Sequence, residues 1–449
     1  MKNLLDRNLG TIAMPHHLPS TPMDVFSAKP ETLETVRKAK VFGWWDFPLE
    51  DVGVDNPEMN ANDSAYWHYA SGNPITKTKQ EVSEAVFQSG ISAVGLPGDF
   101  ETESSLTVGA AGDLIRADGL EYSKDILFEG IEDILFDTDV AFANYESVVA
   151  EDDVVKKSIV DGQSFIMCCS STQYTALTEH RGRRFDVLNI ANNHSLDLGV
   201  ESLSTTQDLF LRDGIMDIGA PRSAQEYGKG KVFVRNGIKL GFVSATFSLN
   251  GKPLPTGQEF RVHTSKLMSR YVPPDLELLR AQIADCKIRG CDFIVASIHW
   301  GVEFEFFPRL RQIEAAHALV EEGVDLILGA HPHVIQPVEY YRTKRDPNRI
   351  AVIAYSLGTL TWGWYTAPHL ILSLIMHLKL AKGHVGGEPR TYIESAKPNP
   401  VYRNISEEAN GRFMRIQKLC DQDENGGAAC AIVKMKQYAT LVLGDGWAY

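Results

Sequence analysis

The sequence predicts a layered α/β domain, and three observations support this prediction. From Leu106 onward, apolar and largely β-branched runs alternate with segments of helical periodicity, a pattern typical of parallel sheets covered by helices. Gly290 and Gly323 stand where helices would end, each shortly before a predicted strand. Polar residues recur where successive strands end, which is where parallel sheets bind ligands.

The individual elements can be assigned in order along the chain. Seven apolar runs are typical of strands buried on both faces: Leu106–Ala111, Val140–Asn144, Phe185–Ala191, Leu240–Thr246, Phe293–His299, Leu326–Gly329 and Ile350–Ser356. Five segments favour helices: Tyr122–Leu135, Ser170–His180, Val200–Asp213, Asp275–Arg289 and Arg309–Glu321. The apolar run 369–376 is too short to span a bilayer and is interpreted as another buried strand.

Three regions are expected from the change of composition along the chain. Residues 1–105 are rich in Pro, Asn, Asp and Ser and have weak periodicity, so they predict an irregular N-terminal extension wrapped on the main domain. Short helices are expected at Pro30–Ala39 and Lys79–Gln88, and the tryptophans of this region are interpreted as docking anchors. Residues 106–395 form the main domain, and residues 396–449 form a polar tail packed on it.

Composition excludes several classes of function. The net charge of −14 over 449 residues, with no basic cluster, argues against a nucleic-acid partner. None of the six cysteines belongs to a C-x-x-C pair, which argues against a thiolate zinc site. The N-terminus lacks the long apolar region of a signal peptide, and no run is long enough to act as a membrane anchor, so a cytoplasmic protein is expected.

Polar side chains follow five of the predicted strands. They are Asp113, Glu146, Asn193 with His194 and Asp197, His299, and the pair His331 and His333. Because parallel strands bring their carboxyl ends together, we expect these side chains to form one cluster. Carboxylates, an amide oxygen and imidazoles are ligands for Zn, Mn or Fe. The cluster therefore predicts a site for one or two divalent ions, with a carboxylate able to bridge two ions about 3.5–4 Å apart.

The ordered set of motifs resembles a known family. The motifs are Gly112-Asp113, Asn144-x-Glu146, Ala191-Asn-Asn-His194-Ser-Leu-Asp197-x-Gly199, His299-Trp-Gly301, Gly329-Ala-His331-Pro-His333 and Tyr355-Ser-Leu-Gly358. They resemble the bacterial capsule synthesis proteins of the CapA/PgsA type, linked to poly-γ-glutamate capsules. Those proteins are similar in fold to calcineurin-like metallophosphoesterases. The resemblance covers roughly residues 106–393 and implies a β-sheet sandwich flanked by helices.

The resemblance also implies roles for single residues. Asp113 and His333 would hold one metal, Glu146 would bridge, and Asn193, His299 and His331 would hold the second. His194 would be the general acid and Asp197 its orienting group, while Gln336 and Tyr355-Ser356 would line or support the pocket.

Three positions depart from the family pattern. Ile115 stands where calcineurin-like enzymes have a histidine ligand. Ala330 stands where a histidine is frequent, and Thr359 where an asparagine is frequent.

Three functions are compatible with these residues. The first is a metal-dependent hydrolase of the phosphoesterase type, acting on a small-molecule, peptide or polymer substrate. The second is a metal-dependent peptide epimerase that uses the same site for proton abstraction next to a carbonyl. The third is a non-catalytic accessory protein of polymer biosynthesis.

Overall fold

Two β-sheets form the centre of the molecule. The computed structural model describes residues 18–26, 28–82, 84–88, 94–159, 165–408, 411–422 and 429–448. The first sheet has the order β18 (Gly411–Lys418), β17 (Glu388–Glu408), β16 (Leu372–Val385), β1 (Glu101–Leu114), β2 (Val140–Tyr145), β7 (Val187–Asn189) and β8 (Met216–Ile218), with β15 (Thr359–Thr361) beside β1. The second has the order β13 (Val338–Arg342), β14 (Ile350–Ala354), β12 (Leu326–Ala330), β11 (Phe293–His299), β10 (Ile238–Thr246) and β9 (Lys231–Arg235).

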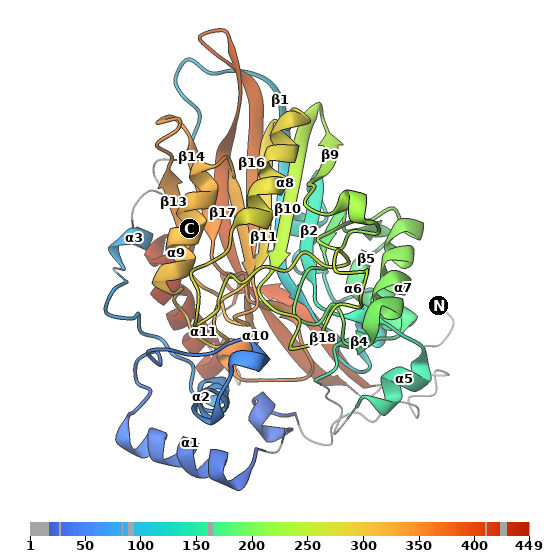
Figure 1. Cartoon of the computed structure of the whole chain (residues 1–449), viewed down its shortest axis with the longest axis vertical. Helices are drawn as coiled ribbons and strands as arrows, with labels where there is room; N and C mark the ends of the chain where they lie inside the picture. Colours follow the sequence, from blue (N-terminus) through green and yellow to red (C-terminus); the bar gives the residue numbers. More distant parts are fainter. Residues whose placement is uncertain are drawn as a thin grey trace.

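The two sheets pack face to face and helices cover them. One apolar core contains residues of both sheets, and the rings of Phe142 on β2 and Phe242 on β10 stack at 6.1 Å across it. Leu279 of α8 (Glu277–Ile288) and Leu319 of α9 (Leu310–Glu321) belong to the same core. The other face of the first sheet packs on α6 (Ser171–Thr178) and α7 (Gly199–Arg212). The predicted sandwich flanked by helices is confirmed (Figure 1).

The strands that carry the predicted site are parallel within each sheet. β1, β2, β7 and β8 pair in parallel in the first sheet. β10, β11, β12 and β14 pair in parallel in the second. The predicted site residues come from the carboxyl ends of strands in both sheets, so the sandwich brings two sets of strand ends to one place.

Most predicted elements are present, with shifts of a few residues. All seven predicted strands occur, although the third is only three residues long in β7. Four of the five predicted helices also occur. The remaining helix, predicted at Tyr122–Leu135, does not form. This region instead holds a 3₁₀ turn at Leu120–Ser123 and the short helix α4 (Glu132–Leu135). Gly130 between them makes a β-bridge with Gln417, and this tertiary contact replaces the helical hydrogen bonds.

The N-terminal extension is more regular than predicted. It contains α1 (Pro30–Phe42), the unpredicted helix α2 (Ala61–Gly72) and α3 (Ala85–Gln88), which is shorter than expected. Figure 1 shows α1 and α2 at the lower edge of the molecule, below the sheets. Trp45 is buried, but its edge-on contacts with Tyr66 and Tyr69 lie within the extension, and Trp44 is more than half exposed. Trp67 does contact the main domain, since its indole N–H donates to Glu303.

The C-terminal part continues the first sheet. The run 369–376 begins with the short helix α10 (Pro368–Ile371) and continues as β16, so the strand prediction holds from Leu372 onward. β17 runs across residue 395, and the chain then forms β18 and α11 (Ala429–Leu443). The remaining small elements are β3 (Val148–Val149), β4 (Cys168–Cys169), β5 (Glu179–His180), β6 (Arg183–Arg184) and α5 (Asp152–Lys157). Within the described ranges, no helix is both long and apolar enough to cross a bilayer.

Candidate metal centre

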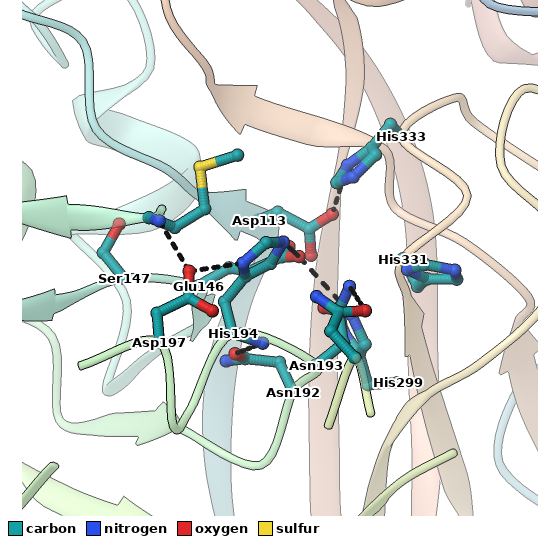
Figure 2. Close-up of polar contacts among 12 residues, drawn as sticks. Asp113, Glu146, Ser147, Asn192, Asn193, His194, Asp197, His299, His331 and His333 are labelled. Atoms are coloured by element: carbon teal, nitrogen blue, oxygen red, sulfur yellow. Dashed lines mark hydrogen bonds and ion pairs between the residues drawn. The ribbon is translucent and has the colours of Figure 1, made fainter. Parts of the chain in front are cut away.

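All eight predicted site residues lie in one connected cluster between the sheets (Figure 2). Asp113 at the end of β1 contacts His333, with Oδ2 and Nδ1 3.3 Å apart. Glu146 follows β2, and its Oε1 lies 3.5 Å from Nε2 of His299 and 3.9 Å from Nε2 of His194. The remaining members, Asn193, Asp197 and His331, contact His299 or His194.

Two glycines allow the backbone to approach closely at the site. A Cβ at Gly112 would lie 2.0 Å from the carbonyl oxygen of Gly358. A Cβ at Gly329 would lie 1.9 Å from the carbonyl oxygen of Tyr355. Both distances are far below van der Waals contact, so neither position can carry a side chain while the strands keep this spacing. The glycines thus fix the strand ends that carry Asp113 and His331.

The turn after β12 has an unusual backbone. His331 has φ = 97° and His333 has φ = 57°, a region that residues other than glycine adopt rarely. Such conformations cost about 1–3 kcal/mol each and persist where the surroundings impose them. Their effect here is to direct both imidazoles into the cluster, as Figure 2 shows.

Glu146 is the buried group with the greatest need for a cation. Its side chain is fully buried, and neither carboxylate oxygen has a hydrogen-bond partner. An unpartnered buried carboxylate costs several kcal/mol unless a positive charge compensates it. Nδ1 of His331 is likewise buried without a partner. The donor set therefore fits a bound metal.

Two groups of ligand atoms share Glu146. Glu146, His299 and His331 form one group, and Asp113, Glu146 and His333 form the other, with the ligand atoms of each group within 4.8 Å of one another. Oδ1 of Asn193 lies 2.9 Å from Nε2 of His299, close to the roughly 3 Å expected between neighbouring ligands of an ion bound at about 2.1 Å. This arrangement matches the division of ligands that the resemblance implied.

Buried amides hold the first carboxylate in place. Nδ2 of Asn144 donates to Oδ1 of Asp113 at 2.8 Å. Asn189 in turn donates to Oδ1 of Asn144 at 2.8 Å, and the hydroxyl of Ser244 on β10 donates to Asn189 at 2.5 Å. This chain of hydrogen bonds crosses from one sheet to the other, so the sandwich itself orients Asp113.

Burial and neighbouring charges shift the pKa values of the clustered side chains in different directions. Burial and the charge of Asp113 raise the pKa of Glu146 well above its usual value. Burial lowers the pKa of His299 to about 3, and burial with the nearby imidazoles lowers that of His331. For His333, burial is outweighed by the hydrogen bond to Asp113 and by the charge of Glu146, and the pKa rises to about 9. His299 and His331 are therefore neutral near pH 7, the form in which an imidazole binds metal.

His194 and Asp197 form a second pair next to the ligand groups. Nδ1 of His194 lies 2.7 Å from Oδ2 of Asp197. That carboxylate also accepts from the backbone N–H of Met167 at 2.7 Å and from the ammonium of Lys252. Burial would raise the pKa of Asp197, but His194 and Lys252 lower it below its usual value. Asp197 therefore stays ionised and fixes the His194 ring, whose Nε2 points toward Glu146.

The three departures from the family pattern have structural consequences. Ile115 is fully buried in the apolar core and supplies no ligand atom. Thr359 partly takes the place of the frequent asparagine, because its hydroxyl lies 2.8 Å from Nδ1 of His333. Ala330 pairs with His299 at the end of β12.

The chain is similar to proteins of bacterial capsule synthesis. The profile of the family described as "Bacterial capsule synthesis protein PGA_cap" matches residues 69–361, which include every predicted site residue. The chain belongs to this family. The match begins within α2, so the last part of the N-terminal extension lies inside the PGA_cap region.

Curated relatives of this chain are named for the synthesis of PGA, capsules or polyglutamine. The chain is 28% identical to the "PGA biosynthesis protein CapA" of Bacillus subtilis (strain 168), over 62% of this chain and 68% of that protein. It is 26% identical to the "Capsule biosynthesis protein CapA" of Bacillus anthracis, over 64% and 69%. It is 24% identical to a "Probable polyglutamine synthesis accessory protein" of Mycobacterium tuberculosis (strain CDC 1551 / Oshkosh), over 46% and 53%.

Solved structures overlap this PGA_cap protein only in part. The calcineurin-like phosphoesterase YfkN from Bacillus subtilis aligns with a TM-score of 0.36 and 14% identity, over 75% of this chain and 98% of that chain.

A cavity of about 520 Å³ opens beside the cluster, a volume typical of small-ligand sites. Asn193, His194, Asp197 and His331 line one side of it. The N-terminal extension lines the cavity with apolar residues, among them Val52, Val54, Met59, Tyr66 and Trp67, and with the polar residues Asn56, Asp63, Ser64 and His68. The extension of this PGA_cap protein therefore forms one wall of the candidate site.

Sequence reasoning expected the loops 247–262 and 303–308 to line the pocket, but it gave no role to a single residue of either loop and did not place Trp67 at the site. Glu303 lies with His331 and His333 in a third group of ligand atoms within 4.8 Å, and Trp67 and Lys252 also line the cavity. The position of Glu303, directly after the His299-Trp-Gly301 motif, was the available signal. Gln336, Tyr355 and Ser356 do not line this cavity; their side chains hydrogen-bond Glu305, Glu339 and Val334 and support the surrounding backbone.

Proposed function

We propose that this protein is a metal-dependent hydrolase of the phosphoesterase type. The observation that supports the proposal most directly is Glu146. It is fully buried, both of its oxygens lack partners, and it belongs to two groups of ligand atoms at once. A carboxylate in that position is suited to bridge two divalent ions.

The proposed ligands follow from the two groups. Asp113 and His333 hold one ion, Asn193, His299 and His331 hold the other, and Glu146 is shared. Nitrogen and oxygen donors without a thiolate favour Mn, Zn or Fe. Ions bound in this way supply an activated water and positive charge for a developing oxyanion.

His194 is the proposed general acid. Asp197 holds the proton on Nδ1, which leaves Nε2 facing the ligand groups, 3.9 Å from Glu146. A protonated Nε2 there can donate its proton to the leaving oxygen of a substrate. Lys252 and the backbone N–H of Met167 keep Asp197 ionised and in place, so they orient the acid without contacting the reacting atoms.

The cavity suggests the size and character of the substrate. About 520 Å³ accommodates a small molecule or a short segment of a longer chain. The anionic end of such a ligand would lie against the metal ligands, and its less polar part against the wall formed by the extension. Relatives of this chain are named for PGA and capsule biosynthesis, and the proposal therefore includes peptide-linked substrates.

The test is a reconstitution and activity screen. Protein freed of metal by a chelator is loaded with Mn²⁺, Zn²⁺ or Fe²⁺ and assayed on phosphomonoesters, phosphodiesters and γ-glutamyl peptides. We expect metal-stimulated turnover that His194→Ala removes and that His317→Ala, at a histidine bonded to Glu339 outside the site, leaves intact. Turnover that is absent in every metal form, or equal in both variants, contradicts the proposal. Running the peptide reactions in heavy water tests epimerisation, which requires deuterium uptake at Cα.

A non-catalytic role is the second candidate, favoured by one specific finding. The mycobacterial relative carries the word "accessory" in its name. If the site is retained only for stability, replacing both His331 and His333 by alanine leaves polymer production in cells unchanged once protein levels are matched. Loss of production in that double variant argues for chemistry at the site.

A further inference from the structure

Glu303 is a carboxylate that the predicted ligand set does not use, although it faces that set. It lies in the loop after β11, and its side chain is about one-fifth exposed. Oε1 lies 3.9 Å from Nε2 of His331. Glu303, His331 and His333 can bring their ligand atoms within 4.8 Å of one another. Glu303 therefore lies beside both histidines of the turn after β12.

One oxygen of Glu303 is held by the N-terminal extension. The indole Nε1–H of Trp67 on α2 donates to Oε2 at 2.5 Å. This hydrogen bond fixes the carboxylate and leaves Oε1 directed at His331. Hydrogen bonds from a second group to a metal-binding carboxylate commonly set its orientation and its affinity for the ion.

The helix that carries Trp67 is firmly attached to the loop that carries Glu303. Tyr66, the neighbour of Trp67, donates to the buried carboxylate of Glu305 at 2.6 Å, and Arg309 pairs with the same carboxylate at 2.5 Å. The backbone of Ile75, just after α2, makes hydrogen bonds with Phe304 and Phe306 on both sides of Glu305. These contacts hold α2 and the loop as one unit.

The same loop is attached to the turn that bears the two histidines. The backbone N–H of Phe304 donates to the carbonyl of Pro332 at 2.8 Å, between His331 and His333. Glu303 is therefore held on one side by α2 and on the other by the metal-binding turn. A displacement of α2 would be transmitted directly to the carboxylate.

We propose that Glu303 is a further metal ligand of the centre, shared with His331 and His333, and that Trp67 is its positioning residue. The proposal rests on the metal centre put forward as the proposed function. Glu303 would add an oxygen donor beside His331 and His333, in a centre where Ile115 supplies none. It also gives the extension a role, since α2 then completes the metal site as well as one wall of the cavity.

The experiment measures metal binding directly and does not depend on a substrate. Metal-free protein is titrated with Co²⁺ and with Mn²⁺ by calorimetry, and the Co²⁺ form is followed by its visible absorption. The variants are Glu303→Gln, which keeps the size but removes the charge, and Trp67→Phe, which keeps the ring but removes the N–H. Trp44→Phe is the matched control, because Trp44 belongs to the same extension but is more than half exposed.

We expect Glu303→Gln to weaken one binding event by about 10- to 100-fold and to change the Co²⁺ spectrum. Trp67→Phe should weaken the same event by a smaller factor at unchanged stoichiometry, and Trp44→Phe should behave as the wild type. Thermal unfolding checks that each variant is folded, and Glu303→Asp, which withdraws the carboxylate by one methylene, is the second variant if Glu303→Gln fails to fold.

The outcomes separate this inference from the proposed function. If His331→Ala abolishes metal binding while Glu303→Gln binds with wild-type affinity and spectrum, Glu303 is not a ligand and only the inference fails. If the wild-type protein binds no divalent ion, the proposed function fails as well. If Glu303→Gln weakens binding but Trp67→Phe does not, the positioning role of Trp67 is wrong.

Discussion

Replacing Glu146 by glutamine should stabilise the metal-free protein and reduce the stabilisation that metal gives. Without metal, the wild-type chain holds two carboxylates, Asp113 and Glu146, in one fully buried cluster, and both oxygens of Glu146 lack partners. Burial and the charge of Asp113 raise the pKa of Glu146, so the ionised form is disfavoured in the folded state. Glutamine has nearly the same size and carries no charge, so it removes the repulsion.

The magnitude follows from the buried contacts. Relief of an unpartnered buried charge is worth about 1–3 kcal/mol, so Glu146→Gln should be more stable than wild type by that amount in a chelator. With metal at 100 times its dissociation constant, the wild type gains about 2.7 kcal/mol by linkage. A ligand change that weakens binding about 10- to 100-fold removes about 1.3–2.3 kcal/mol of that gain at this metal concentration. Metal should therefore reduce the stability advantage of Glu146→Gln by that amount.

The assay is urea unfolding of both proteins in chelator and in excess Mn²⁺ or Zn²⁺. Glu339→Gln serves as the control, because Glu339 is equally buried but accepts hydrogen bonds from Tyr355 at 2.7 Å and pairs with His317 at 2.8 Å, away from the site. It should lose stability in both buffers. If Glu146→Gln is no more stable than wild type in chelator, and metal stabilises both equally, the reasoning about Glu146 is refuted.

Three further predictions test other parts of the structure. His194→Ala should lower metal-stimulated turnover by about 10²- to 10⁴-fold at unchanged metal stoichiometry, and wild-type kinetics would exclude His194 as the acid. Gly329→Ala should lower the free energy of unfolding by about 3 kcal/mol, because its Cβ would lie 1.9 Å from the carbonyl of Tyr355; an unchanged urea midpoint would contradict this. Burial lowers the pKa of His369 to about 4, although its ring contacts the Ser71 carbonyl at 2.9 Å. Stability should thus fall by about 3 kcal/mol as the pH drops from 6.5 to 4, and His369→Gln, which keeps a donor without titrating, should flatten that part of the pH profile; an equally steep profile would contradict it.

The clustering of the candidate ligands was predictable because their signal is local. His299 and the pair His331 and His333 each follow a continuous apolar strand, and the carboxyl ends of parallel strands converge in any sheet of this kind. Asp113 lies at the end of β1, and Glu146 directly follows β2. What the pattern did not contain was the arrangement of these strands in two sheets whose ends meet, with the Asn144–Asn189–Ser244 hydrogen bonds crossing between them.

The contribution of the extension was not predictable from the sequence pattern. The hydrogen bond from Trp67 to Glu303 joins residues 236 positions apart. The spacing of apolar residues along a sequence does not predict a contact between residues so far apart. The helix α2 itself left a signal that was overlooked: Asn60 and Asp63 form a capping box, in which Asn60 accepts from the N–H groups of the first turn.

The most direct test of the proposed metal centre is anomalous diffraction from crystals grown with Mn²⁺ or Zn²⁺, measured on both sides of the absorption edge of the metal. We expect strong peaks beside Glu146, with His299, His331 and Asn193 around one ion and Asp113 and His333 around the other. Anomalous peaks confined to surface carboxylates, with none beside Glu146, would contradict the claim that this cluster is a metal centre.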